Sequence, residues 1–504
     1  MTRPLLKTWL IALIVALVAN RPAQAAVKLH GLIAAGAVLQ QGIDVPIWGT
    51  ANDGEKVTVK FQDQTVSTVA SAGRWLVKLK PLKPGGPFVL TITGENKIEV
   101  QDLLVGEVWV CSGQSNMQFN LKEATNSAVA IAAATDPLLR VLTVAPNYQA
   151  EPQSDLAAAW QVCNPTNAPG FTAVGYFFGR DLRQAVKVPV GLIHSSVGGT
   201  PAQAWASPAV LRANPLFKGF FEGHAQSVSN YLPALAQFKA DESQLQEKWK
   251  AAVEQAKQAG KPEPRPPSPP TNPVNRGPGC LYNGMIAPLL PYAIRGVIWY
   301  QGESNVGNPQ QYAILFPTLI KDWRTAWGQG DFPFLFVQIA PFHTMTPELR
   351  EAQLRTWQTT PKTAMAVITD CGEATNIHPR QKEPVGQRLA LAARAIAYGE
   401  SIEYSGPIYE SLTVTGSHVV LSFQHTGAGL VAIGGDLKGF TIAGSDKVFT
   451  NASATIKDRQ VIVANPGVPQ PVAVRYGWSN VPTVNLFNQE GLPATPFRTD
   501  WPEQ

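Results

Sequence analysis

A serine and a histidine, two side chains that can together perform acyl transfer, both occur in suitable settings in this sequence. Ser115 lies in the stretch Trp109-Val110-Cys111-Ser112-Gly113-Gln114-Ser115-Asn116-Met117, where an apolar run gives way abruptly to small polar residues. This pattern predicts a buried strand, a sharp turn and the start of a helix. Gly113 allows the turn, and free N–H groups at a helix start can face a developing anion. We therefore predict that Ser115 is a nucleophile.

A serine that only caps an ordinary turn is the alternative, and an isolated Gly-Gln-Ser motif favours it. The setting of His378 argues for the nucleophile. His378 lies in the polar loop Asn376-Ile377-His378-Pro379, before an amphipathic helix that ends at Gly399. A histidine whose pKa is near neutrality can accept the serine proton and return it to a leaving alcohol. His194 competes on strand position, but it sits within an apolar run, which predicts a structural role.

Acyl transfer also requires hydrogen-bond donors for the oxyanion of a tetrahedral intermediate. The candidates are the backbone N–H groups of Ser115 and Gly198-Gly199, together with the side-chain amide of Gln301 or Asn305. Each glycine alone could serve a turn, but these polar clusters follow consecutive predicted strands. Other side chains in the clusters are candidates for supporting roles: Gln114, Asn116, Glu303, Asn305 and Asp370.

Strands and helices alternate from Val105 to Gly399, which predicts an α/β fold, a parallel sheet with helices on both faces. The predicted strands are the apolar runs 104–110, 188–195, 295–300, 334–339 and 363–369. Ligands bind at the carboxyl ends of strands in such sheets, so the polar clusters lie at the expected edge. One predicted helix has a single apolar face, formed by Tyr312, Leu315, Phe316, Leu319, Ile320 and Trp323.

The rest of the chain divides by composition. Residues 1–25 have a basic start, an apolar segment and a small-residue cleavage site, which predicts a signal peptide and a periplasmic or secreted product. Residues 26–104 and 400–504 contain short alternating runs between turn residues. These runs predict an N-terminal β-sandwich-like domain and a C-terminal β domain on either side of the α/β domain, residues 105–399.

One inserted segment, residues 211–279, interrupts the alternation of strands and helices. Glu242 to Ala259 has a charged helical pattern, and Lys261 to Pro278 is dense in proline. We predict a helical excursion with a stiff return. Shaping the rim of the site and simple surface decoration are both open roles for this insertion.

Composition excludes several function classes. The 504 residues are 45% hydrophobic and 15% charged, with a formal net charge of +5 and no basic run, which argues against nucleic-acid binding. Beyond the signal peptide, no apolar run is long enough for a membrane span. Metalloprotease, P-loop and dinucleotide motifs are absent, so we expect no metal or other cofactor. The sequence does not predict an oligomeric state.

Four cysteines would enter an oxidising compartment after export and allow up to two disulfides. Their spacing leaves the pairing open, and buried free thiols are the alternative. They are Cys111, Cys163, Cys280 and Cys371.

Several motifs in order resemble those of the sialate O-acetylesterase family, a branch of the SGNH hydrolases. They are GQSNM after VGEVWVCS, GGTPAQAW after VGLIHSS, WYQGESN, and IHPRQKEPVGQRLALAARAIAYG. The similarity extends to the chain's end, at Asn485-Leu486-Phe487-Asn488, Gly491-Leu492-Pro493 and Pro496-Phe497-Arg498-Thr499-Asp500.

The resemblance implies a serine esterase that removes acetyl groups from sugars, with Ser115 as nucleophile and His378 as base. It also implies an oxyanion hole formed by the Ser115 N–H, a glycine of Gly198-Gly199, and Gln301. Gln301 would replace the asparagine that is usual in the wider superfamily.

The sequence departs from the superfamily at one position. The superfamily has an aspartate three residues before the histidine, and Thr375 stands there in this chain. Asp370, Glu373 or Glu303 could orient His378 instead, or a backbone carbonyl could do so. We favour a Ser-His dyad. A third-group carboxylate fixes the tautomer and stabilises the imidazolium, so its absence should lower the rate without changing the type of reaction.

Three hypotheses for function follow. The first is hydrolysis of O-acetyl esters of sialic acid, and the second is the same chemistry on other acetylated glycans such as xylan or pectin. The third is a non-catalytic glycan-binding protein on an esterase fold, against which the presence of Ser115, His378 and Gln301 argues.

Overall fold

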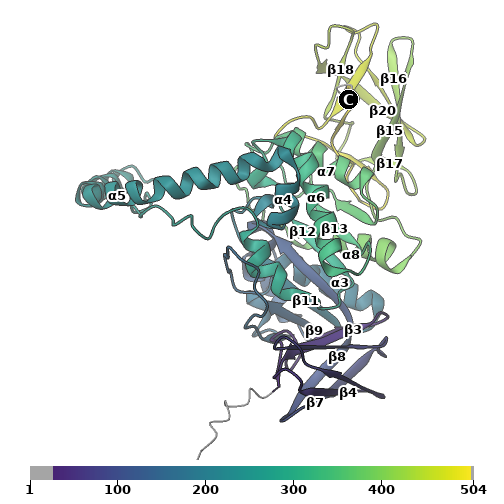
Figure 1. Cartoon of the computed structure of the whole chain (residues 1–504). Coiled ribbons are helices and arrows are strands. Elements are labelled where there is room, and N and C mark those ends of the chain that lie inside the picture. The colour runs from purple at the N-terminus through teal and green to yellow at the C-terminus, as the bar shows by residue number, and fades with distance from the viewer. Residues whose placement is uncertain (1–26, 501–504) are drawn as a thin grey trace, which may run out of the picture.

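The computed structural model describes residues 27–500, so the predicted signal peptide, residues 1–25, lies outside the described residues. A central α/β layer lies between an N-terminal β region and a C-terminal β region, at the bottom and the top of Figure 1. Between residues 27 and 500, no helix combines the length and the apolar character needed to cross a membrane.

The N-terminal region is built from short strands whose side chains alternate between buried and exposed. Val57, Val59 and Phe61 of one strand, and Trp75, Val77 and Leu79 of another, face the core, as the alternating sequence predicts. The strands are β1 (Lys28–Leu29), β2 (Val38–Gln40), β3 (Val45–Thr50), β4 (Lys56–Phe61), β5 (Gln64–Val69), β6 (Arg74–Leu79) and β7 (Gly85–Thr93).

One long strand, β8 (Lys97–Gly113), joins the N-terminal region to the central layer. Its first half pairs antiparallel with β7 and parallel with β2, where Leu104 is opposite Val38. Its second half pairs with two parallel strands, and Gly113 is opposite Ser196 and Tyr300. The predicted boundary at residue 104 therefore falls inside a continuous strand. A parallel strand lies on each side of its end, and these two neighbours hold the turn before Ser115 in place.

The central sheet has the strand order β10-β9-β11-β8-β12-β13-β14, with β10 antiparallel to its neighbour β9 and the others parallel. The predicted α/β fold class with flanking β structure is thus confirmed. All five predicted strands end at the same edge. The strands that follow β8 are β9 (Asp136–Thr143), β10 (Trp160–Cys163), β11 (Val190–Ser196), β12 (Gly296–Tyr300), β13 (Phe334–Val337) and β14 (Thr363–Ala366).

Helices cover both faces of this sheet. Helices α3 and α8 pack on the face that includes Ile298, whereas α6 and α7 pack on the face that includes Trp299. All six residues of the predicted apolar face of α6 are buried. The helices are α1 (Ser115–Gln118), α2 (Ser127–Ala132), α3 (Ala173–Val186), α4 (Pro208–Ala213), α5 (Lys218–Gln258), α6 (Pro309–Trp327), α7 (Pro347–Thr359) and α8 (Glu383–Tyr398).

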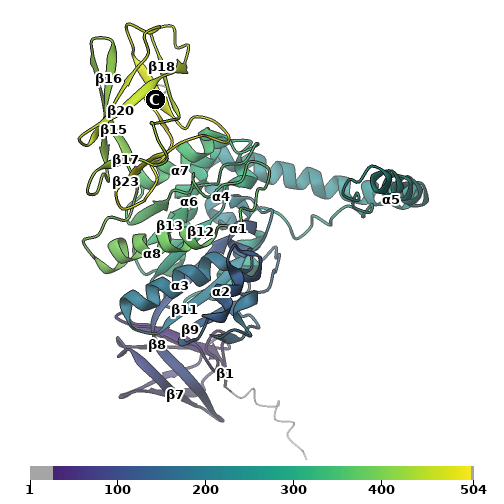
Figure 2. The same cartoon turned by 180° about the vertical axis from the view of Figure 1, so that it is seen from behind.

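The inserted segment contains α5, which projects from the side of the central layer in both views (Figures 1 and 2). None of its residues is buried. The sequence predicted helix from Glu242 only, whereas α5 begins at Lys218. Gly219, Gly223 and Pro233 disfavour helix in the first half of α5, and for this reason the sequence did not predict that the helix begins at Lys218.

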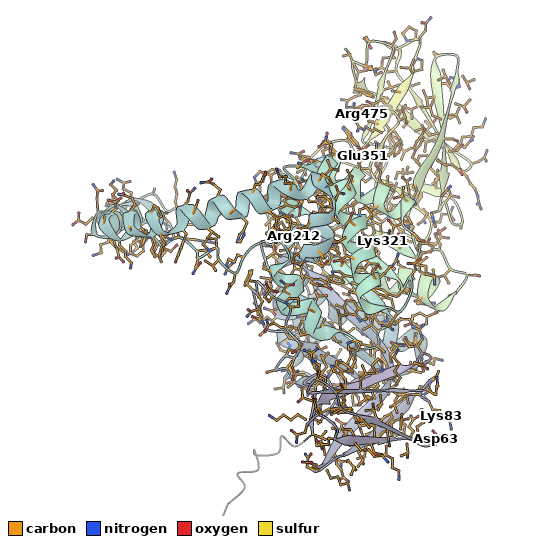
Figure 3. All side chains as sticks on the ribbon, viewed as in Figure 1. Asp63, Lys83, Arg212, Lys321, Glu351 and Arg475 are labelled. Carbon is orange, nitrogen blue, oxygen red and sulfur yellow. The ribbon has the colours of Figure 1, made fainter. Side chains whose placement is uncertain are left out.

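The C-terminal region consists of antiparallel sheets around a core of its own. Glu351 of α7 lies where this region meets the central layer (Figure 3) and pairs with Arg498 at 2.6 Å. Its strands are β15 (Ile408–Thr415), β16 (His418–Gln424), β17 (Leu430–Ala432), β18 (Phe440–Ala443), β19 (Thr450–Asn451), β20 (Ser453–Lys457), β21 (Gln460–Ala464), β22 (Ala473–Tyr476), β23 (Leu486–Asn488) and β24 (Phe497–Arg498).

The four cysteines are free and buried, so the alternative of buried thiols holds in this structure. Burial raises the pKa of Cys163 and of Cys280 to about 11. These thiols are therefore poor nucleophiles at neutral pH.

We expect Gly113→Ala to destabilise the fold. Gly113 has a φ of +134°, and a Cβ atom there would collide with the carbonyl group of Tyr300. The substitution should lower the free energy of unfolding by about 2 kcal/mol or more, as measured by urea unfolding. Gly170→Ala is the matched control, because no atom lies within 4 Å of the added carbon. Equal unfolding midpoints for the two variants would contradict this account of the turn.

Candidate active site

Ser115 and His378 lie together at the carboxyl edge of the central sheet. The Nε2 atom of His378 is 2.8 Å from the Oγ atom of Ser115, although the residues are 263 positions apart. Ser115 is the first residue of α1, directly after β8, and its side chain is half-buried. The N–H of Gln114 donates to the carbonyl of Tyr300 at 2.9 Å, which fixes the turn against β12. The serine is thus accessible and in hydrogen-bond contact with a base.

The loop that carries His378 is held by the side chain of Asn376. The Oδ1 atom of Asn376 accepts from the His378 N–H at 3.0 Å, and its Nδ2 atom donates to the His378 carbonyl at 3.0 Å. Asn376 also donates to Glu373 at 3.0 Å. These contacts define the loop's shape and leave the imidazole directed at Ser115.

Asn116, the residue after the serine, connects the three segments of the site. Its Nδ2 atom donates to Oε1 of Glu303 at 2.7 Å and to the carbonyl of Ile377 at 3.0 Å. Its Oδ1 atom accepts from Nζ of Lys382 at 2.5 Å. Asn116 is fully buried, so the bonds are shielded from water. Lys382 could not be recognised from the sequence, because a lysine before an amphipathic helix normally lies on the surface.

The charged groups of this network shift the pKa values of one another and of His378. Burial lowers the pKa of Lys382 to about 7, against the opposing effect of Glu303. Burial also raises the pKa of Glu303, although its own backbone N–H and Asn116 lower it. Burial and the charge of Lys382 lower the pKa of His378, and the negative charge of Glu123 opposes this by raising the same pKa. The neutral imidazole, the form that can accept a proton, is therefore favoured.

Three of the predicted oxyanion donors are already engaged, and one of them is the Asn305 amide, whose Nδ2 atom donates to Oε1 of Gln203 at 3.0 Å. The N–H of Gly198 donates to Oε1 of Gln118 at 2.8 Å. The amide of Gln301 is fully buried and donates to Asn305 at 2.7 Å and to the carbonyl of Thr200 at 3.3 Å. These bonds shape the turns after β11 and β12.

The N–H groups of Ser115 and Gly199 are the donors left at this edge. Neither has an acceptor among residues 27–500. Gly199 has a φ of +70°, a conformation that glycine adopts readily and that ends the turn after β11. Both groups are therefore free to meet an incoming oxygen.

None of the candidate carboxylates contacts the His378 ring. Asp370 forms a bidentate pair with Arg388, with both distances 2.7 Å, and Glu373 accepts from Asn376 and from the Arg380 N–H. Within residues 27–500, no carboxylate forms a hydrogen bond or ion pair with that imidazole.

The rival histidine, His194, is buried within β11 and contacts Ser196 at 2.6 Å. Burial lowers its pKa to about 4. Among the described residues it forms no hydrogen bond with Ser115, and it belongs to the strand's packing, as its apolar setting predicted.

An accessible serine beside a histidine, at the carboxyl edge of a parallel sheet, is the arrangement of a carboxylic ester hydrolase, and comparison with known proteins agrees with this class. The family model "Carbohydrate esterase, sialic acid-specific acetylesterase" matches residues 105–255 and 275–395. The chain belongs to this family of carboxylic ester hydrolases.

Three relatives illustrate the similarity. The chain is 31% identical to sialate O-acetylesterase of Mus musculus over 90% of each chain. It is 32% identical to sialate O-acetylesterase of Homo sapiens over 75% of this chain and 72% of the human protein. A crystal structure of a carbohydrate acetylesterase from Xanthomonas citri has a TM-score of 0.80 and 37% identity, covering 94% of this chain and all of that one.

We expect Lys382→Met to change the pH dependence of esterase activity. Loss of the positive charge should raise the pKa of His378, so the acidic limb of the kcat/KM profile should move to higher pH. The profile is measured with an aryl acetate under conditions in which the variant is folded. Lys122→Met removes an exposed cation, which does not shift the pKa of His378, and should leave the limb in place. A limb that moves to lower pH, or does not move, would contradict the electrostatic role.

Proposed function

We propose that the protein hydrolyses O-acetyl esters of carbohydrates through a Ser-His acyl-enzyme mechanism. The 2.8 Å contact between His378 Nε2 and Ser115 Oγ is the observation that carries the proposal. Family membership supports the acetyl ester of a sugar as the substrate. O-acetylated sialic acid is the first substrate that we propose, supported by the names of the mammalian relatives.

In the first proposed step, His378 removes the proton of Ser115 as its oxygen attacks the acetyl carbonyl. The N–H groups of Ser115 and Gly199 stabilise the oxyanion, since both are unengaged. His378 then protonates the departing sugar hydroxyl. In the second step, His378 activates water against the acetyl-serine, and acetate leaves. Atoms balance as ester plus water giving sugar alcohol plus acetic acid.

A second candidate is the same hydrolysis on other acetylated glycans such as xylan or pectin. The similarity to the Xanthomonas citri protein supports it, because that protein is described by the broader term carbohydrate acetylesterase. Comparing rates on O-acetylated sialic acid and on acetylated xylan distinguishes the two candidates.

Ser115→Ala should abolish acetate release from acetylated sugars and from an aryl acetate. Loss of the nucleophile should lower kcat by at least about a thousandfold. Enzymatic measurement of acetate with O-acetylated sialic acid, acetylated xylan and an aryl acetate checks this. Ser304→Ala is the control, since Ser304 is an exposed serine in the turn after β12. A Ser115→Ala variant as active as the wild type would exclude the proposed nucleophile.

Carboxylate substitutions separate a dyad from a triad. We expect His378→Ala to lower kcat by at least about a thousandfold, but Asp370→Asn and Glu373→Gln by no more than about tenfold. The reason is that neither carboxylate contacts the imidazole. Steady-state kinetics on an aryl acetate provides the measurement, with thermal unfolding as the check on folding. A loss for either carboxylate variant equal to that for His378→Ala would assign it the third catalytic position.

A further inference from the structure

A cleft of about 490 Å³ lies between the edge of the central sheet and the base of the inserted segment. Its walls are formed by residues 198–204 after β11, residues 219–227 of α5, the return segment 273–280, and Tyr148. This volume is in the range of small-molecule sites. Helix α5 therefore has a role at its base, although most of its length projects away from the body (Figures 1 and 2).

The cleft reaches the turn after β11 that lies against the serine. Gly198 and Gly199 line it, and a Cβ atom on Gly198 would be 3.2 Å from the Cβ of Ser115. An ester carbonyl bound by the Gly199 N–H would place the rest of the ester close to this turn, and so beside the cleft that both glycines line. We propose that the cleft is the subsite for the sugar that carries the acetyl ester, and this assignment rests on the proposed function.

The lining has the polar groups that recognise sugars. Gln203, His224, Ser227 and Arg276 contribute side chains to it. The guanidinium group of Arg276 lies 4.0 Å above the ring of Tyr148. Arg276 has no ion pair among residues 27–500, so its donors are available to sugar hydroxyls or to a sugar carboxylate.

A hydrogen bond of His224 connects two walls of the cleft, α5 and the return segment. Its Nε2 atom is 2.9 Å from the carbonyl of Pro273, which can only accept, so Nε2 carries the proton. Gly277 makes this approach possible, because a Cβ atom there would lie 2.8 Å from the His224 ring. The base of α5 and the return segment thus form one built wall.

Two glycines keep this wall open. Gly219 and Gly223 lie on the cleft side of α5, and no atom lies within 4 Å of a Cβ built on either. Glycine is a poorer helix former than alanine, so helix stability does not account for these two residues. A large side chain at Gly223 can therefore occupy the cleft without disrupting a packed contact.

Gly223→Phe tests the subsite. We expect kcat/KM on O-acetylated sialic acid or on acetylated xylan, divided by kcat/KM on an aryl acetate, to fall by at least about tenfold. Ala225→Phe is the matched control, since Ala225 is exposed on α5 and does not line the cleft. An unchanged ratio, or the same ratio change in both variants, would overturn the subsite. A wild-type protein that releases no acetate from any glycan would instead refute the proposed function.

Arg276→Gln identifies which sugar chemistry the subsite recognises. A loss confined to O-acetylated sialic acid supports the subsite and assigns a carboxylate contact to Arg276. An equal loss on sialic acid and on neutral acetylated xylan supports the subsite with contacts to hydroxyls. No loss on either glycan would overturn the placement of the sugar against Arg276.

Discussion

The hydrogen bonds of one buried side chain, Asn116, hold the active-site region together. Its amide meets Glu303 after β12, the Ile377 carbonyl beside the histidine, and Lys382 before α8. A buried amide with every contact satisfied has few alternative orientations, because breaking any bond would leave a polar group unpaired. The distance between Ser115 and His378 thus depends on the hydrogen bonds of an asparagine to the histidine loop. In a triad, a carboxylate that accepts from the imidazole would position the histidine instead.

Two buried ionisable groups flank this asparagine, and their burial is only partly compensated. The Nζ atom of Lys382 lies 4.9 Å from the ring of Phe119 and 5.2 Å from that of Tyr300, which favours the cation. Glu303 has one oxygen, Oε2, without a hydrogen-bond partner among residues 27–500. Such groups reduce stability, so their presence beside the proposed catalytic pair fits an electrostatic role in setting the basicity of His378.

Periodicity predicted much of the fold, since burial follows the same spacing that the chain's apolar residues have. The six residues of the α6 face were predicted this way, and continuous apolar runs predicted five of the six parallel strands, all but β9. Ser115 and His378 could be paired because each follows the end of a predicted strand. The hydrogen bond from the Gly198 N–H to the side chain of Gln118 could not be predicted, because the two residues are 80 positions apart in the sequence. The same holds for Lys382, whose burial arises from packing against residues that are distant in sequence.

The turn at Gly198-Gly199 belongs both to the proposed oxyanion hole and to the proposed sugar subsite. The Gly199 N–H is free for the ester oxygen, while both glycines line the cleft at the base of α5. If the sugar fits this cleft poorly, the carbonyl of its acetyl ester would lie farther from the Gly199 N–H. The result is weaker stabilisation of the transition state, beyond weaker binding alone. Sugar recognition should therefore affect kcat as well as KM, even though the cleft wall lies outside the sheet that positions the serine.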